Sequence, residues 1–347
     1  MFKKTVLIGL TGLILASGVS AVNINLPAFQ SDFQALIQGI GEDLAPSLRL
    51  GALAGDVQGD ASIDHFSVDL GLGVNTTNGL GTILRPGAYV WQFQALPLDN
   101  LVNDNASSTF FEHLMAYPSA KVAFGFALGS WDFTVSGSYL PQVGVSSVSK
   151  TNPQFSFGNF GVQVRKTLIH DPQTLNWVPG LSLGTSYHVT FFNFTSHITS
   201  LSDLGIGTQS LGGGQNLDIN GTFGFHTFSQ VATIDLHLSK RIAFVTPYVK
   251  FSGAYQNSTF TGDTNLNAVV TGGTTSQSEN IVANPVVNIS DFAFLANPGL
   301  EIDIGPVVFN INADIDVGRA NLSISRWDLN GINANAIAIN TGIRFTF

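Results

Sequence analysis

The carboxyl end of the chain, "NAIAINTGIRFTF" (335–347), alternates apolar and polar residues almost without interruption. Successive side chains of an extended strand point to opposite faces. One face would carry Ile337, Ile339, Thr341, Ile343, Phe345 and Phe347, and the other would carry Ala338, Asn340, Gly342, Arg344 and Thr346. The stretch therefore predicts a β-strand that ends on an aromatic residue, although chain termini in water commonly fray.

The same period of two recurs along most of the chain. It is clear in "HFSVDLGLGV" (65–74), "KVAFGFAL" (121–128) and "WDFTVSGSYL" (131–140). Because only Gly129-Ser130 separates the last two runs, they predict a β-hairpin. Further runs lie at 160–165, 181–191, 232–239, 249–255, 300–304 and 309–317, the last two joined by a turn at Gly305-Pro306, with weaker ones near 82–94, 215–227, 257–270 and 319–328. Together they predict roughly 12–14 strands, with 14 preferred, since bacterial barrels have even numbers.

The amino terminus has the three parts of a secretory signal. Lys3 and Lys4 precede a short apolar core at 6–16, and Val19-Ser20-Ala21 supplies small residues for cleavage. The core is too short for a spanning helix, which needs about 20 residues. We therefore expect residues 1–21 to be removed after Ala21. With no cysteine in the chain, disulfides, thiol catalysis and a lipoprotein signal are excluded.

The composition is apolar without any long apolar run. Only 11% of residues are charged, against about 25% in ordinary soluble domains, and the chain holds 37 Gly and 27 Phe. A closed antiparallel transmembrane β-barrel spreads its hydrophobicity in period two, because only alternate residues face lipid. We therefore expect an all-β barrel over residues 61–347, located in the outer membrane with lipid as a partner. The net charge of −9 argues against nucleic acid as a partner.

A half-exposed antiparallel sandwich would also alternate. Its strands would not combine charges on the polar face of many strands with an apolar face rich in Phe, Trp and Tyr. The barrel is the interpretation that we carry forward.

Residues 22–60 differ from the rest by their helical spacing. The apolar residues at this spacing are Phe29, Phe33, Leu36, Ile37, Ile40 and Leu44. Ser31-Asp32-Phe33-Gln34 has the form of a capping box, and Pro46 is expected to end the helix. Two interpretations remain open, an amphipathic periplasmic helix and a plug in the periplasmic mouth of the barrel. The Gly/Ser/Thr/Asn-rich segments 199–219 and 262–290 predict long loops on the outer surface.

With the aromatic face of each strand toward lipid, the opposite face lines the lumen. The lumen-facing residues that we single out are Asp235, His237, Glu301, Asp303, Asp314, Asp316 and Arg344. The last four carboxylates lie on two consecutive strands, so they predict either an acidic selectivity element or a solvated wall with neighbouring cations. The seven histidines include no H-E-x-x-H. We expect no enzymatic activity, metal or cofactor.

The last residues also resemble a known targeting signal. "TGIRFTF" is similar to the carboxyl-terminal signal of bacterial outer-membrane proteins, with Gly342 upstream and Phe345 and Phe347 on one face. The resemblance implies recognition by the barrel-assembly machinery, after escort by periplasmic chaperones.

Three stretches resemble the FadL-like transporters of hydrophobic compounds from spirochaetes and related bacteria. They are "YPSAKVAFGFALGSWDFTVSGSYLPQ" (117–142), "FGVQVRKTLIHD" (160–171) and "VPGLSLGTSYHVT" (178–190). The resemblance implies a 14-stranded barrel with an amino-terminal plug that moves hydrophobic molecules inward. No Asn-Pro-Ala hatch motif follows the expected cleavage site, so no fatty-acid-binding residue is carried over.

Two functions follow from these features. The first is an outer-membrane channel or passive transporter for a small-molecule solute, including hydrophobic solutes such as long-chain fatty acids. The second is a surface-exposed structural or adhesin-like barrel whose outer loops bind a partner. Whether residues 22–55 occupy the lumen decides between an open pore and a gated carrier.

Overall fold

The computed structural model describes residues 26–53, 66–75, 117–144, 154–171, 178–200, 209–212, 215–271, 277–319 and 336–347. These residues form one helix, α2 (Leu26–Leu53), and twelve strands. The strands are β1 (Ser67–Asn75), β2 (Tyr117–Leu128), β3 (Trp131–Gly144), β4 (Gln154–Ile169), β5 (Gly180–Ile198), β6 (Gln209–Gly212), β7 (Gln215–Ser239), β8 (Val245–Thr271), β9 (Gln277–Ala283), β10 (Val286–Ile304), β11 (Val307–Asp316) and β12 (Ile337–Thr346). The expected signal peptide and the expected boundary near residue 60 lie outside the described residues.

Ten of the described strands close into an antiparallel barrel. Their order around the barrel is β1, β2, β3, β4, β5, β7, β8, β10, β11 and β12, and the last pairs with the first. Strands β6 and β9 pair only with the outer ends of β7 and β8. The closed antiparallel barrel is confirmed.

The barrel has ten strands, fewer than the 14 that we preferred, although the described residues form twelve strands in all. Strand β7 contains two runs that the sequence pattern separates, 215–227 and 232–239, and β8 contains the runs 249–255 and 257–270. The weak run 82–94 and all but the first residue of the run 319–328 lie outside the described residues.

The two ends of the barrel differ in their connections. Both predicted hairpins are confirmed, with Gly129 and Gly305 at φ 64° and 63°, a backbone conformation that glycine adopts without strain. The amide of Thr346 donates to the carbonyl of Pro306, so the carboxyl terminus lies at the end with the short turns. Since bacterial barrels have short periplasmic turns and longer extracellular loops, we assign this end to the periplasm.

The outward face near the short turns is apolar. Exposed side chains on this face include Leu72, Phe124, Phe126, Phe160, Leu183, Ile234, Phe251, Phe294, Phe309 and Ile339. Strands β1, β11 and β12 have 9 or 10 residues, the length that a tilted strand needs to cross a membrane. This continuous apolar band supports an outer-membrane location, because soluble proteins rarely expose so large a patch.

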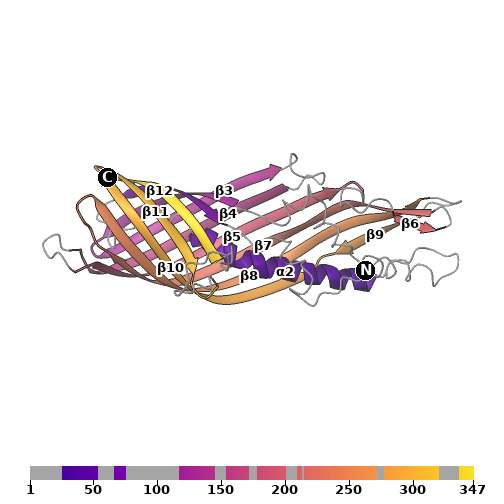
Figure 1. Ribbon diagram of the computed structural model, residues 1–347, viewed down its shortest axis with the longest axis horizontal. Coiled ribbons are helices and arrows are strands. Elements are labelled where there is room, and N and C mark those ends of the chain that lie inside the picture. Colours follow the sequence, from indigo (N-terminus) through magenta and orange to yellow (C-terminus); the bar gives the residue numbers. More distant parts are fainter. Residues whose placement is uncertain are drawn as a thin grey trace, which may run out of the picture.

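Beyond this band the polarity of the two faces is reversed. Along β8, the outward residues Val249, Phe251 and Tyr255 are followed by Asn257, Thr259, Thr261, Asp263 and Asn265. The inward residues change in the opposite sense, from Lys250 and Ser252 to the buried Phe260, Leu266 and Ala268. Strands β7 and β8, with 25 and 27 residues, are more than twice as long as a span requires. The outer part of these strands therefore protrudes into water (Figure 1).

This reversal corrects two expectations. The segment 262–290 is not a long loop, since β8, β9 and β10 occupy most of it, and 199–219 includes β6 and the start of β7. Their outward faces are polar because they meet water, and this composition is typical of loops. The aromatic face is also not turned to lipid everywhere, because Phe157, Phe192, Phe194, Phe225 and Phe260 are buried on the inner face.

Helix α2 lies along the protruding strands β7 and β8, and its carboxyl-terminal end reaches the outer end of the barrel (Figure 1). It contacts strands on all sides, namely β1, β4, β5, β7, β8, β9, β10, β11 and β12. Its 28 residues span about 42 Å. Within the described residues, no helix is both long enough and apolar enough to cross a membrane.

The helix does not end at Pro46 as expected, but continues to Leu53. An interior proline removes one hydrogen bond and costs about 3 kcal/mol. The surrounding turns compensate for this cost, because Leu44, Leu48 and Leu50 are almost fully buried in the lumen.

Candidate functional site

The outer part of α2 packs on the apolar inner face of the protruding strands. Phe33 makes an edge-on contact with Phe223 of β7, with ring centroids 5.4 Å apart. Leu36, Ile37, Ile40 and Leu44 continue this buried stripe at helical spacing. The opposite side carries the exposed Gln30, Ser31, Gln34 and Gln38. This part of the helix is therefore amphipathic.

Two glycines bring the helix and the wall into close contact. A Cβ atom at Gly41 of α2 would lie 2.6 Å from Cδ1 of Ile289, and one at Gly262 of β8 would lie 2.7 Å from Cε1 of Phe33. No real Cβ atom tolerates such distances, so each position requires glycine unless the neighbour moves. The helix is thus packed closely on the inner face of β8 and β10.

Arg49 anchors the helix to the wall through ion pairs. Its side chain is fully buried, and its Nη1 and Nη2 lie 3.0 Å from Asp291 and 2.5 Å from Asp316. Arg319 pairs with the same two carboxylates from the more exposed side, at 2.9 and 3.7 Å. Two arginines and two carboxylates therefore form a charge-balanced cluster between α2, β10 and the end of β11.

Gln256 of β8 adds polar contacts beside this cluster. Its Nε2 donates to the carbonyl oxygen of Ala45 at 2.8 Å, and its Oε1 accepts from Arg49 at 3.3 Å. Side-chain contacts hold the helix here, so it could detach without any change in the backbone of the barrel.

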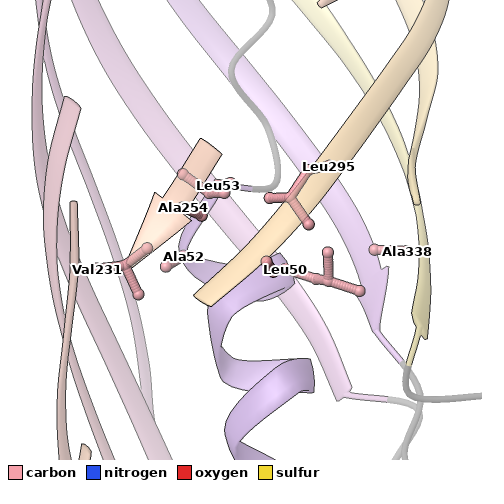
Figure 2. Close-up of a cluster of buried hydrophobic side chains, with 8 residues drawn as sticks. Leu50, Ala52, Leu53, Val231, Ala254, Leu295 and Ala338 are labelled. Carbon is pink, nitrogen blue, oxygen red and sulfur yellow. The ribbon is translucent and has the colours of Figure 1, made fainter. Parts of the chain in front are cut away.

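The last turn of α2 closes the outer end of the lumen. Leu50, Ala52 and Leu53 pack against Val231, Ala254, Ala293, Leu295 and Ala338 from the surrounding strands (Figure 2). Small residues on the wall leave room for the helix at this level. The cluster forms an apolar seal at the outer end of the barrel.

Lys121 of β2 binds the carboxyl end of the helix. Its Nζ donates to the carbonyl oxygen of Ala52 at 3.3 Å. The last carbonyls of a helix lack intrahelical partners, and the helix dipole places negative charge there. A buried lysine on the wall is therefore electrostatically suited to the end of the plug.

The inner half of the lumen, toward the short turns, is polar and charged. Arg165 pairs with Asp132 at 3.0 Å and donates to Nδ1 of His237 at 3.0 Å. Arg344 pairs with Glu301 at 3.1 Å. Cations and anions alternate across neighbouring strands, so the inner wall of this half is nearly balanced in charge.

The structure places the seven selected lumen residues as follows. Asp235, His237, Glu301, Asp314, Asp316 and Arg344 are buried on the inner face, and Asp303 is half-buried near the short turns, paired with Arg241. Glu301, Asp303 and Asp316 face arginines, and Asp314 accepts from the side chains of Asn297 and Asn340 at 2.6 and 2.7 Å. The four carboxylates therefore belong to paired networks and not to a free acidic patch.

The predicted plug residues lie in α2, and Phe33, Leu36, Ile37 and Ile40 are buried against the wall. Phe29 lies in the first turns, and its side chain is outside what the structure describes. Helix α2 lies at the end of the barrel opposite to the short turns, and not at the mouth that we assign to the periplasm. The direction of the helix follows from Leu53, which packs in the apolar cluster with Ala338, and from Phe33, which contacts Phe223.

The residues of the expected assembly signal lie on β12. Gly342 pairs with Gly71 of β1 and with Asn310 of β11, and Phe345 pairs with Val68 and Val307. Phe347 is 75% exposed on the lipid-facing side, with its ring centroid 6.1 Å from that of Phe66. Recognition by the barrel-assembly machinery stays a prediction.

Three residues of the site were missed from the sequence. Arg49, Gln256 and Lys121 come from distant parts of the chain, and only the folded barrel brings them together. One signal was available: Arg49 follows an apolar run inside the expected plug, where an unpaired charge would be costly. Among the described residues, no group of three or more His, Asp or Glu side chains could hold a metal ion.

No protein-family model matches the chain, and no curated relative does. Solved structures similar to it include the toluene transporter TbuX of Ralstonia pickettii, with 12% identity, a TM-score of 0.28, and coverage of 87% of this chain and 93% of that chain. The translocator domain of the autotransporter NalP from Neisseria meningitidis matches with 8% identity and a TM-score of 0.31, over 93% and 100% of the two chains. A Pseudomonas aeruginosa FadL homologue matches with 7% identity and a TM-score of 0.26, over 88% and 98%. The structural neighbours are thus FadL-family transporters and other outer-membrane barrels, and at this TM-score the likeness carries no argument about the solute.

Proposed function

We propose that this protein is an outer-membrane channel that α2 holds closed. The observation that carries the proposal is the position of α2, whose last turn closes the outer end of a barrel with a polar interior. Buried charges are costly in a purely structural core, whereas channels commonly have polar interiors. The helix is attached by side-chain contacts of Arg49 and Gln256, which can be broken without opening the barrel wall.

The side chains that surround the outer part of α2 favour an apolar solute. If α2 moved, its place would be lined by the phenyl rings of Phe192, Phe225 and Phe260, which now pack around the helix. Pockets for apolar ligands are lined mainly by such side chains, with few polar groups. Hydrophobic molecules such as long-chain fatty acids would find this lining, and they would then meet the polar inner half.

The second candidate function is a surface-exposed structural or adhesin-like barrel. The protruding ends of β7 and β8, extended by β6 and β9, favour it because they present a polar surface beyond the membrane. In that case α2 would be a permanent core that never leaves the lumen, and the barrel would not conduct.

Planar-bilayer conductance separates the two functions. The native protein is expected to conduct rarely, whereas a variant lacking residues 26–53 is expected to conduct steadily, because the apolar seal at the outer end is gone. A synthetic peptide of residues 26–53 added to the deletion variant should lower the conductance again.

The control is Gln38→Ala, on the exposed side of α2, which should conduct as rarely as the native protein. Correct folding of each variant is checked by the heat-dependent gel mobility that closed barrels show. A folded deletion variant that stays silent would contradict the channel and favour the structural barrel.

A further inference from the structure

The direction of α2 is a separate feature from its role as a plug. Phe33, near the start of the helix, contacts Phe223 in the protruding part of β7, and Leu53, its last residue, packs at the outer end of the lumen in a cluster with Ala338. Strand β1 then begins at the opposite end of the barrel, where Ser67 pairs with Thr346 beside the short turns. Between Leu26 and Ser67 the chain therefore passes from the outer end of the barrel to its periplasmic end.

The outer end of the helix lies in the part of the molecule that meets water. At the level of Gly262, next to Phe33, the outward side chains of β8 are Thr261 and Asp263, well beyond the lipid-facing Phe251 and Tyr255. The side of α2 turned away from the wall carries uncharged polar residues. These are Gln30, Ser31, Gln34 and Gln38, of which Gln38 donates to Glu42 one turn later at 3.0 Å.

The exposure of α2 changes along its length. From Leu44 onward every residue is buried, including the polar Ser47 and Arg49, whereas the exposed residues are confined to the first half. The carboxyl-terminal end of the helix is therefore the end that is inserted deepest. The gradient and the direction of the chain agree with each other.

We propose that the barrel presents the amino-terminal end of α2 on the outer surface of the cell. The protein then acts as a display platform for its own amino-terminal end, besides any role as a channel. A polypeptide attached ahead of Leu26 would be carried to the cell exterior and held there by Arg49 and the apolar seal. This inference depends on the direction of the helix and not on whether the barrel conducts.

Single-cysteine labelling tests the proposal cleanly, because the chain contains no cysteine. Ser31→Cys, on the exposed side of α2, is the test position, and Gln34→Cys is the second variant should the first fail to fold. Asn265→Cys, exposed on the protruding part of β8, is the outer reference, and Pro306→Cys, in a short turn, is the periplasmic reference. A membrane-impermeant maleimide is applied to intact cells and then to permeabilised cells.

Ser31→Cys and Asn265→Cys are expected to label to the same extent in intact cells, whereas labelling of Pro306→Cys should require permeabilisation. If Ser31→Cys behaves like Pro306→Cys, the start of the helix faces the periplasm and the proposal is overturned. Failure of Ser31→Cys and Gln34→Cys to label under either condition would equally overturn it, since both residues would then be buried. Conductance is not read in this experiment, so its outcome is separable from that of the channel.

Discussion

Replacing Arg49 with alanine is expected to lower the free energy of unfolding by about 3–5 kcal/mol, the usual cost of leaving a buried charge without its partner. Asp316 is 2% exposed and would lose its nearest cation, which now lies 2.5 Å away. The same change removes the strongest polar contact between α2 and the wall. We therefore also expect more frequent opening of the channel. Denaturant unfolding in detergent micelles measures the first effect, and planar-bilayer recording measures the second.

Arg319→Ala is the matched control for this prediction. Arg319 pairs with the same carboxylates, but its side chain is 39% exposed, and ion pairs in contact with water contribute about 0–1 kcal/mol. It also lies outside α2, so its loss leaves the helix attached. Equal effects of the two substitutions on stability and on opening would contradict the assignment of Arg49 as the anchor.

Phe251→Arg is expected to destabilise the barrel by about 2–4 kcal/mol, the cost of an arginine near the middle of a membrane on the lipid-facing side. Phe251 is 48% exposed and lies near the middle of the apolar stretch of β8. The effect should appear as a lower unfolding midpoint in lipid vesicles and as a smaller folded fraction in the outer membrane.

The control lies on the same strand and the same face. Asn265 is exposed beyond the change in polarity, so Asn265→Arg should alter stability by no more than about 0.5 kcal/mol. A large cost at Asn265, or none at Phe251, would show that the boundary of the membrane has been misplaced.

The barrel itself could be predicted because its signal is local. Alternation in runs such as 121–128 and 131–140, with Gly129-Ser130 between them, defines a hairpin without any tertiary information. The carboxyl-terminal strand was likewise readable, and it pairs with both β1 and β11. Such patterns depend on every second residue of one segment, so they can be recognised without knowing which strands lie beside it.

The number of strands and the loops could not be predicted in the same way. The alternation gives no sign of where a strand leaves the membrane, because at that point both faces change polarity and the period of two continues. The residues around Asn257 therefore divide one strand into two apparent runs. Thr259, Thr261 and Asn265 have the composition of a loop, although they belong to a paired strand.

The site was only partly predictable, because its contacts join residues far apart in the chain. The apolar stripe of α2 indicated a plug, but the stripe gives no direction of insertion. That direction depends on partners such as Gln256 and Asp291, more than 200 residues away from Arg49. The prediction that the helix ends at Pro46 was wrong for a related reason. Burial of the surrounding turns stabilises a helix that the proline would otherwise end.

Amide hydrogen exchange along α2, in the folded protein reconstituted in lipid, tests most directly that the carboxyl-terminal turns of this helix, and not its start, are held within the barrel. We expect protection to rise along the helix, from weak near Gln30 to strong between Leu44 and Leu53, where the wall surrounds it and Arg49 and Lys121 hold it. Uniformly rapid exchange over residues 26–53, or protection that falls toward Leu53, would contradict this arrangement.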